Sequence, residues 1–98
     1  MIVSEITVKN LADYLKLDFE SLTEEETAEL STFLSSAKAF ISEYTGLNLE
    51  EIDGHETFVI AVYVLVQDMY DNRSYYVDKS NLNQVVAHIL NMHSVNLL

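Results

Sequence analysis

The sequence predicts an all-α fold, a small single-domain bundle of three main helices plus a short N-terminal helix. Apolar residues recur at helical spacing, capping patterns precede these segments, and the chain has no proline. The two glycines, Gly46 and Gly54, stand where one helix should stop and another should start. Residues 1–98 are expected to form one domain, because a chain of this length has room for a single core.

The short helix is expected over residues 8–15. Thr7 can cap it, because a threonine hydroxyl accepts a hydrogen bond from a free backbone N–H of the first turn. Its apolar residues follow the i, i+3, i+4, i+7 spacing of one helix face: Val8, Leu11, Ala12 and Leu15.

The second helix is expected over residues 23–45. Its start, "TEEE", has the pattern of a capping box, and its carboxylates suit the positive end of the helix dipole. Gly46 is the expected C-terminal cap. One apolar stripe runs along this helix: Leu30, Phe33, Leu34, Ala37, Ile41 and Tyr44.

The opposite side of this second helix carries a column of small residues, where long charged side chains would be usual. Its members are Thr32, Ser35, Ala39 and Ser42. Small residues permit close approach by another helix, so the column is a candidate subunit contact. A mildly polar, solvated face is the alternative interpretation.

The third helix is expected over residues 54–72, with Asp53 and Glu56 repeating the capping pattern. It contains the apolar run "FVIAVYVLV", which would also suit a buried strand; length, caps and helical neighbours favour helix. On a helical wheel one stripe faces the core and a second needs another cover, either the last helix or a neighbouring subunit. The second stripe consists of Val59, Tyr63, Val66, Tyr70 and Arg73.

The last helix is expected over residues 81–91, with Asn81 and Gln84 as its capping pair. The preceding "SYYVDKS" is predicted to be an extended loop. Residues 91–98 are a candidate extended tail that binds a partner, and no helical pattern accounts for their apolar residues Val95, Leu97 and Leu98.

The formal net charge of −11 is unevenly distributed. Residues 1–56 carry thirteen Asp and Glu against three Lys, a charge of −10, whereas residues 57–98 carry −1. An acidic surface repels phosphate, and DNA binding depends on Lys and Arg that displace counterions. The composition therefore argues against a protein that grips DNA.

Residue patterns for catalysis, cofactors and metals are missing from the sequence. The chain has no cysteine, no glycine-rich phosphate loop and no HExxH motif, and His55, His88 and His93 include no i, i+4 pair. We expect no enzyme activity, no cofactor and no metal. No signal peptide or membrane span is evident, so a soluble protein is expected.

Two segments carry a resemblance to a known family. "FLSSAKAFISEYTGL" (residues 33–47), followed by an apolar helix that runs into "MYDNRSYYV" (residues 69–77), resembles the head-tail connector proteins of tailed bacteriophages, also called phage DNA-packaging proteins. The chain lacks the family's proline-rich approach to the third helix, and the segment after Lys79 does not match residue by residue. The family's helix-ending residues correspond here to Tyr70, Asp71, Asn72 and Arg73.

The resemblance implies a structural virion protein, an adaptor subunit at the head–tail junction that is made in the bacterial host cytoplasm. Its partners would be copies of itself in a ring, expected to be dodecameric, the portal protein above, and a stopper or tail-completion protein below. DNA would pass through the ring without specific binding. The residues we expect at subunit or partner contacts are Ser35, Ala39, Ser42, Tyr63, Tyr70, Arg73, Leu97 and Leu98.

Arg73 is the only arginine and allows two interpretations. It can cap the negative end of the third helix, or its guanidinium can reach an acidic group of an adjacent subunit. For the whole chain, two other function classes stay open: a small acidic DNA mimic, and a helical interaction or regulatory protein.

Overall fold

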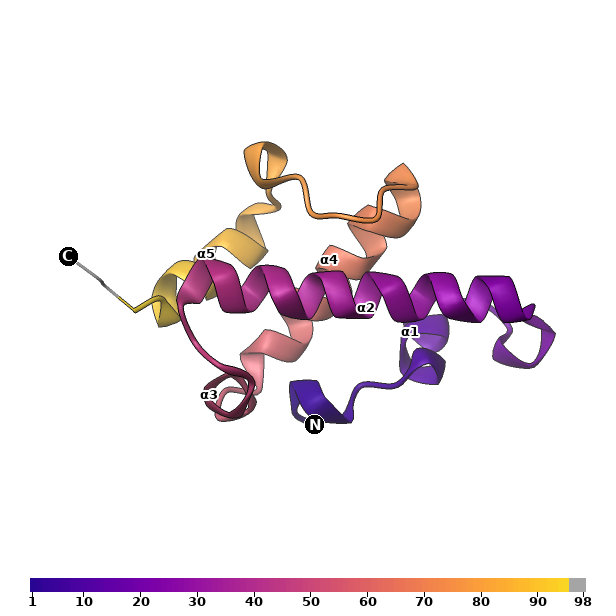
Figure 1. The fold of residues 1–98 in the computed structure, drawn as a ribbon, viewed down its shortest axis with the longest axis horizontal. Helices are drawn as coiled ribbons and strands as arrows, with labels where there is room; N and C mark the ends of the chain where they lie inside the picture. Colours follow the sequence, from indigo (N-terminus) through magenta and orange to yellow (C-terminus); the bar gives the residue numbers. More distant parts are fainter. Residues whose placement is uncertain (96–98) are drawn as a thin grey trace.

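The computed structural model describes residues 1–95, which contain five α-helices and no strand (Figure 1). The predicted all-α fold is therefore confirmed. The α-helices are α1 (Val8–Tyr14), α2 (Glu24–Thr45), α3 (Leu49–Asp53), α4 (Thr57–Asn72) and α5 (Gln84–His93). Three single turns of 3-10 helix complete the described elements: η1 (Val3–Glu5), η2 (Phe19–Ser21) and η3 (Lys79–Asn81).

Helix α2 spans the molecule, and both of its predicted ends are confirmed (Figure 1). The Thr23 hydroxyl accepts a hydrogen bond from the Glu26 N–H at 3.1 Å, and the Glu26 carboxylate accepts one from the Thr23 N–H at 3.1 Å. Gly46 ends the helix with a φ of 77°, a left-handed conformation that glycine adopts without steric cost. The 22 residues of α2 make a rod about 33 Å long.

The core lies where α2 packs against α4 and α5; α1 packs against both α2 and α4, and η1 packs against α3 and α4. α5 runs antiparallel to α4, since His93 at its end lies beside Phe58 at the start of α4. Two aromatic side chains, Phe33 and Phe58, are fully buried. The run "FVIAVYVLV" is thus a central helix, as predicted. The other large, fully buried side chains are Leu11, Leu30, Ile41, Ile52, Leu65, Leu90, Val3, Val62, Val66 and Val86.

The start predicted for the third helix is wrong. Asn48 caps the short helix α3, with Glu51 as its capping-box partner, and Asp53 is the last residue of that helix. The Asp53 carboxylate accepts hydrogen bonds from the backbone N–H and the hydroxyl of Ser4, so it serves a contact across the fold. α4 begins at Thr57 without a side-chain cap.

The start predicted for the last helix is also wrong, by three residues. The Asn83 side chain accepts from the Val85 N–H at 2.8 Å and caps α5, while Asn81 ends the η3 turn. The helix continues to His93, so residues 91–93 are helical and not extended. Beyond it, the Val95 N–H donates to the Thr45 carbonyl at 2.8 Å and holds this segment against the end of α2.

The second apolar stripe of α4 packs partly within the chain, where only Arg73 of its five residues is exposed. The Tyr63 ring stacks on the Tyr14 ring of α1, with centroids 4.8 Å apart and planes 10° apart, and Val66 is fully buried. The exposed side of α4 instead carries Ile60, which is 52% exposed, next to the half-buried Val64. Contacts within the chain therefore cover most of the predicted stripe.

Candidate functional site

The small-residue column lies on the open surface of α2, which crosses the front of the molecule in Figure 1. Ser35 and Ala39 are exposed, and Ala28 and Thr32 extend the same face toward the start of the helix. The Thr32 hydroxyl donates to the Ala28 carbonyl at 3.0 Å, so its hydrogen bond is satisfied within the helix. This face, called the α2 column below, consists of Ala28, Thr32, Ser35 and Ala39.

Ser42, predicted to belong to the same contact, has a role inside the fold. It is half-buried, and its hydroxyl donates to the Leu47 carbonyl at 2.7 Å. This bond ties the last turn of α2 to the chain beyond Gly46. The hydroxyl is thus engaged in closing the α2–α3 turn.

Tyr63 also makes internal contacts. Besides stacking on Tyr14, its hydroxyl lies 3.7 Å from the Met1 sulfur, to which it donates a weak hydrogen bond. Burial and the nearby Asp13 carboxylate both raise the pKa of Tyr63, so its hydroxyl stays protonated at neutral pH. In the monomer this residue joins α1 to α4.

Tyr70 and Arg73 form a cluster at the end of α4. The Arg73 guanidinium lies over the Tyr70 ring, 4.7 Å from its centroid, and its Nη1 donates to Glu29 Oε1 of α2 at 3.1 Å. Arg73 has a φ of 52° and is the left-handed C-terminal cap of α4. Its side chain is 66% exposed, whereas that of Glu29 is 26% exposed.

Glu29 and Tyr75 complete this cluster, and sequence reasoning missed both. The Tyr75 hydroxyl donates to Glu29 Oε2 at 2.9 Å, and this hydrogen bond raises the pKa of Tyr75. The Tyr75 ring stacks on buried Phe33 at 5.5 Å, and the Ser36 hydroxyl donates to the Tyr75 carbonyl at 2.8 Å. The chain after α4 is thereby fastened along α2. The partners are 44 and 46 residues apart, so no local pattern could reveal them.

The predicted contact residues therefore lie in separate places. Ser35 and Ala39 face solvent along the middle of α2, and Glu29 brings Tyr70 and Arg73 to the N-terminal third of that helix. Tyr63 lies at the α1–α4 contact. Leu97 and Leu98 lie outside the described residues.

Two histidines meet where α5 ends against the start of α4. The His55 and His93 rings are 4.1 Å apart, Phe58 lies 5.1 Å from His93, and the Thr57 hydroxyl is 3.5 Å from His93 Nε2. Burial and, to a lesser extent, the neighbouring His55 lower the pKa of His93. Within residues 1–95 no group of three or more potential ligands is arranged to hold a metal ion. The third histidine, His88, is exposed on α5 and lies apart from this pair.

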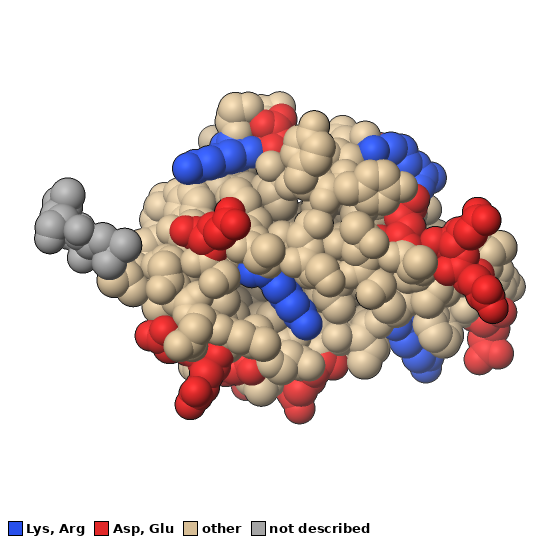
Figure 2. All heavy atoms as spheres, viewed as in Figure 1, with Lys and Arg blue, Asp and Glu red and all other residues tan. Residues whose placement is uncertain are grey.

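Charged side chains border the α2 column but do not cover it. Figure 2 shows Asp and Glu gathered around the N-terminal end of α2 and over α3, with mainly uncharged atoms and one basic side chain between them. The acidic groups at the α2 end include Glu24, Glu25 and Glu26, all exposed. The face between these acidic zones has less electrostatic repulsion to overcome when a neighbour approaches.

None of the helices described is both long and apolar enough to cross a membrane. In comparisons with known proteins, no protein family, no curated protein and no solved structure matches this chain.

Proposed function

We propose that this protein is a structural subunit that assembles into a ring, as the head-tail connectors of tailed bacteriophages do, and that it carries out no catalysis. The ring would lie between a portal protein and a stopper or tail-completion protein. The observation that carries the proposal is the α2 column, an open face of small, uncharged residues on the longest helix of a chain with a charge of −11.

The α2 column suits helix packing for a steric reason. Ala28, Thr32, Ser35 and Ala39 recur every three or four residues, so they share one side of the helix over about 17 Å. Helix axes pack 8–10 Å apart, and small side chains favour the short end of that range. Close approach brings many atoms into contact, and their summed dispersion attraction stabilises the pair.

The charge suits a channel through which DNA moves. An acidic surface offers phosphates no counter-charge, so DNA near it gains little binding energy. The segment order and the residues "YTGL" and "MYDNRSYYV" support the connector assignment over other ring proteins.

Ala39→Arg tests the assembly surface. The added side chain would prevent close approach at the column, so rings seen in electron micrographs of the protein mixed with portal should disappear while helical circular dichroism is retained. Gln67→Arg is the matched control: it adds the same side chain at an exposed position of another helix, α4, outside the column. Normal ring formation by Ala39→Arg would show that the column is only a solvated face.

Native mass spectrometry separates the proposal from the other function classes. A ring requires a large oligomer, alone or with portal, whereas a helical interaction module would stop at a dimer and a DNA mimic would bind a basic protein as a monomer. A stable dimer under all conditions, portal included, would reject the ring.

Arg73 offers a second test of assembly. Its guanidinium pairs with Glu29 of its own chain, yet two-thirds of the side chain is exposed, so its outer edge remains accessible to a neighbour's carboxylate. Lysine keeps the charge but loses the paired donor geometry of a guanidinium. If Arg73 contacts an adjacent subunit, Arg73→Lys should weaken ring formation while leaving the monomer folded. Wild-type assembly by Arg73→Lys would assign Arg73 to the internal cluster alone.

A further inference from the structure

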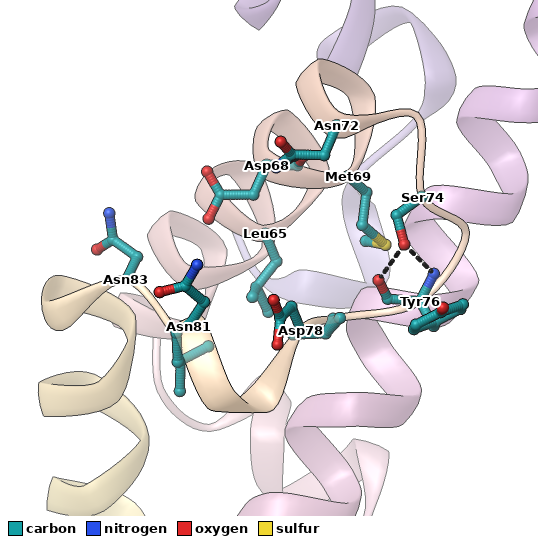
Figure 3. A pocket seen from close by; sticks show the side chains of 11 residues that line it. Leu65, Asp68, Met69, Asn72, Ser74, Tyr76, Asp78, Asn81 and Asn83 are labelled. Carbon is teal, nitrogen blue, oxygen red and sulfur yellow. Dashed lines mark hydrogen bonds between the residues drawn. The ribbon is translucent and has the colours of Figure 1, made fainter.

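An open cavity of about 730 Å³ lies between the C-terminal half of α4, the segment that follows it and the start of α5 (Figure 3). The wall formed by the connecting segment is held in shape by Ser74. Its hydroxyl donates to the Tyr76 carbonyl at 2.9 Å and accepts from the Tyr76 N–H at 3.4 Å. The cavity is distinct from the α2 column and from the Arg73 cluster, because no residue of either lines it.

The cavity combines an apolar wall with polar groups. Leu65 and Met69 are buried side chains of α4, and Leu82 is half-buried. Asp68, Asn81 and Asn83 gather on one side of the cavity in Figure 3. Two of the lining residues are carboxylates, Asp68 and Asp78, and none of the lining residues is Lys, Arg or His.

The two carboxylates differ in their partners. Asp78 Oδ1 accepts from the Ser80 N–H at 3.1 Å and from the Ser80 hydroxyl at 2.6 Å, so donors of its own turn satisfy it. The Asp68 carboxylate is half-buried, and within residues 1–95 it accepts no hydrogen bond and joins no ion pair. Burial, with a further contribution from Asp71, raises the pKa of Asp68, as expected for an anion that lacks a nearby cation.

We propose that this cavity is a binding site for an arginine or lysine side chain on an extended basic segment of a partner protein. The aliphatic part of the side chain would lie along Leu65, Met69 and Leu82, and the charged head would meet Asp68. The side-chain oxygen of Asn81 would accept a further hydrogen bond. Arginine suits the site better than lysine, because its planar fork can donate to a carboxylate and an amide oxygen together.

Charge and composition favour a different protein as the source of this side chain. The chain holds only five Lys and Arg against sixteen Asp and Glu. Arg73 is paired with Glu29, and Lys79 lies over the Tyr44 ring at 5.8 Å, so two of these five already have internal contacts. A basic segment would also be drawn toward a molecule of charge −11 from a distance.

This inference goes beyond the proposed ring and does not depend on it, since the cavity is formed within one chain. A short peptide can test it without any assembly. The α2 column would be tested by Ala39→Arg and the cavity by the variants below, so either proposal can fail while the other stands.

The test is a titration of the ¹⁵N-labelled protein with acetyl-Gly-Arg-Gly-amide, followed by amide chemical shifts. We expect saturable shifts confined to residues around the cavity, including Asp68, Asn81 and Asn83. The matching citrulline peptide, which has the same shape without the charge, should bind at least roughly tenfold more weakly. Equal binding of both peptides, or shifts spread over the acidic end of α2, would overturn the proposal.

Asp68→Asn identifies the group that recognises the cation. It should weaken arginine-peptide binding by roughly tenfold and leave the fold intact, because it removes an uncompensated charge. Asp71→Asn is the matched control: it makes the same charge change three residues away on α4 but does not line the cavity. Unchanged binding by Asp68→Asn, or equal weakening by both variants, would overturn the site.

Discussion

The two ends of α4 are held in place by different interactions. At its start, Phe58 is fully buried and lies against His55 and His93, so contact among rings attaches this end to α5. At its end, Arg73 adopts a left-handed conformation and pairs with Glu29 at the surface. The start is packed and the end is polar and accessible.

The two ends of α4 are therefore expected to contribute differently to folding stability and to binding. Burial of apolar rings contributes several kcal/mol, while an exposed ion pair contributes about 1 kcal/mol or less. The candidate recognition features, the Arg73 cluster and the cavity beside Asp68, both consist of partly exposed polar groups at the C-terminal end of α4, beside the buried Met69. Substitutions there should alter binding with little loss of folding, and substitutions at the start should do the reverse.

Phe58→Ala should produce the largest effect, a loss of about 3–5 kcal/mol in the free energy of unfolding, because it leaves a cavity in a fully buried site. Urea denaturation followed by circular dichroism measures it. The control is Ile60→Ala on the same helix, where the side chain is 52% exposed and a change within about 1 kcal/mol is expected. Similar losses for both would contradict the packing at this end.

Glu29→Gln should have an intermediate effect at the polar end, a loss of about 1 kcal/mol in the free energy of unfolding. The substitution removes the charge that accepts from Arg73 and Tyr75, but the pair is partly exposed, so solvent reduces its contribution. Glu43→Gln, an exposed change near the C-terminal end of α2, should be neutral or slightly stabilising in the same urea assay. Equal losses for the two variants would argue against the cluster.

The features of the fold that depend on neighbouring residues could be predicted from the sequence. The Thr23 capping box and Gly46 define α2 through groups within four residues of one another, and both ends are as expected. Helix α3 was not predicted, although its capping box joins Asn48 to Glu51 over the same short distance, and the choice of Asp53 as a cap was wrong. The Asp53 carboxylate accepts hydrogen bonds from Ser4, 49 residues away, and this contact forms only where η1 packs against α3.

The candidate site was less predictable for the same reason. Ser35 and Ala39 are on the surface, as the helical pattern indicated, because their positions follow from the apolar stripe on the opposite side. The ion pair between Arg73 and Glu29 depends on how α4 packs against α2, and a local sequence pattern does not predict that packing. The cavity beside Asp68 depends on the path of residues 74–82, whose "SYYVDKS" predicted only a loop.

The histidine contact should make the packed end of α4 weakly sensitive to pH. Burial lowers the pKa of His93 in the folded state below its ordinary value of 6.5. Above that value the His93 ring is neutral in both the folded and the unfolded state. As the pH falls below it, the unfolded state takes up the proton first, so the free energy of unfolding decreases. Urea midpoints measured between pH 7.5 and pH 5 should therefore fall less steeply for His93→Gln than for the wild type.

His88→Gln is the control for this pH series, because His88 is exposed on α5. It should keep the wild-type dependence of the urea midpoint on pH. A parallel dependence for His93→Gln and the wild type would place the titrating group elsewhere in the protein.

Substitutions of Arg73 should change the free energy of unfolding least. Two variants separate the contribution of its side-chain contacts from the cost of its left-handed backbone. Arg73→Ala loses the ion pair with Glu29 and the contact with Tyr70 but keeps a left-handed residue with a Cβ, so a loss of about 1 kcal/mol is expected. Arg73→Gly loses the same contacts but relieves the backbone, which a glycine at this helix-end position accommodates without strain. Its free energy of unfolding should therefore lie within about 0.5 kcal/mol of the wild type. Urea unfolding of the two variants under identical conditions gives the difference directly. If glycine were as destabilising as alanine, side-chain contacts alone would hold this end of α4; if glycine is close to wild type, relief of the left-handed backbone offsets the lost contacts with Glu29 and Tyr70.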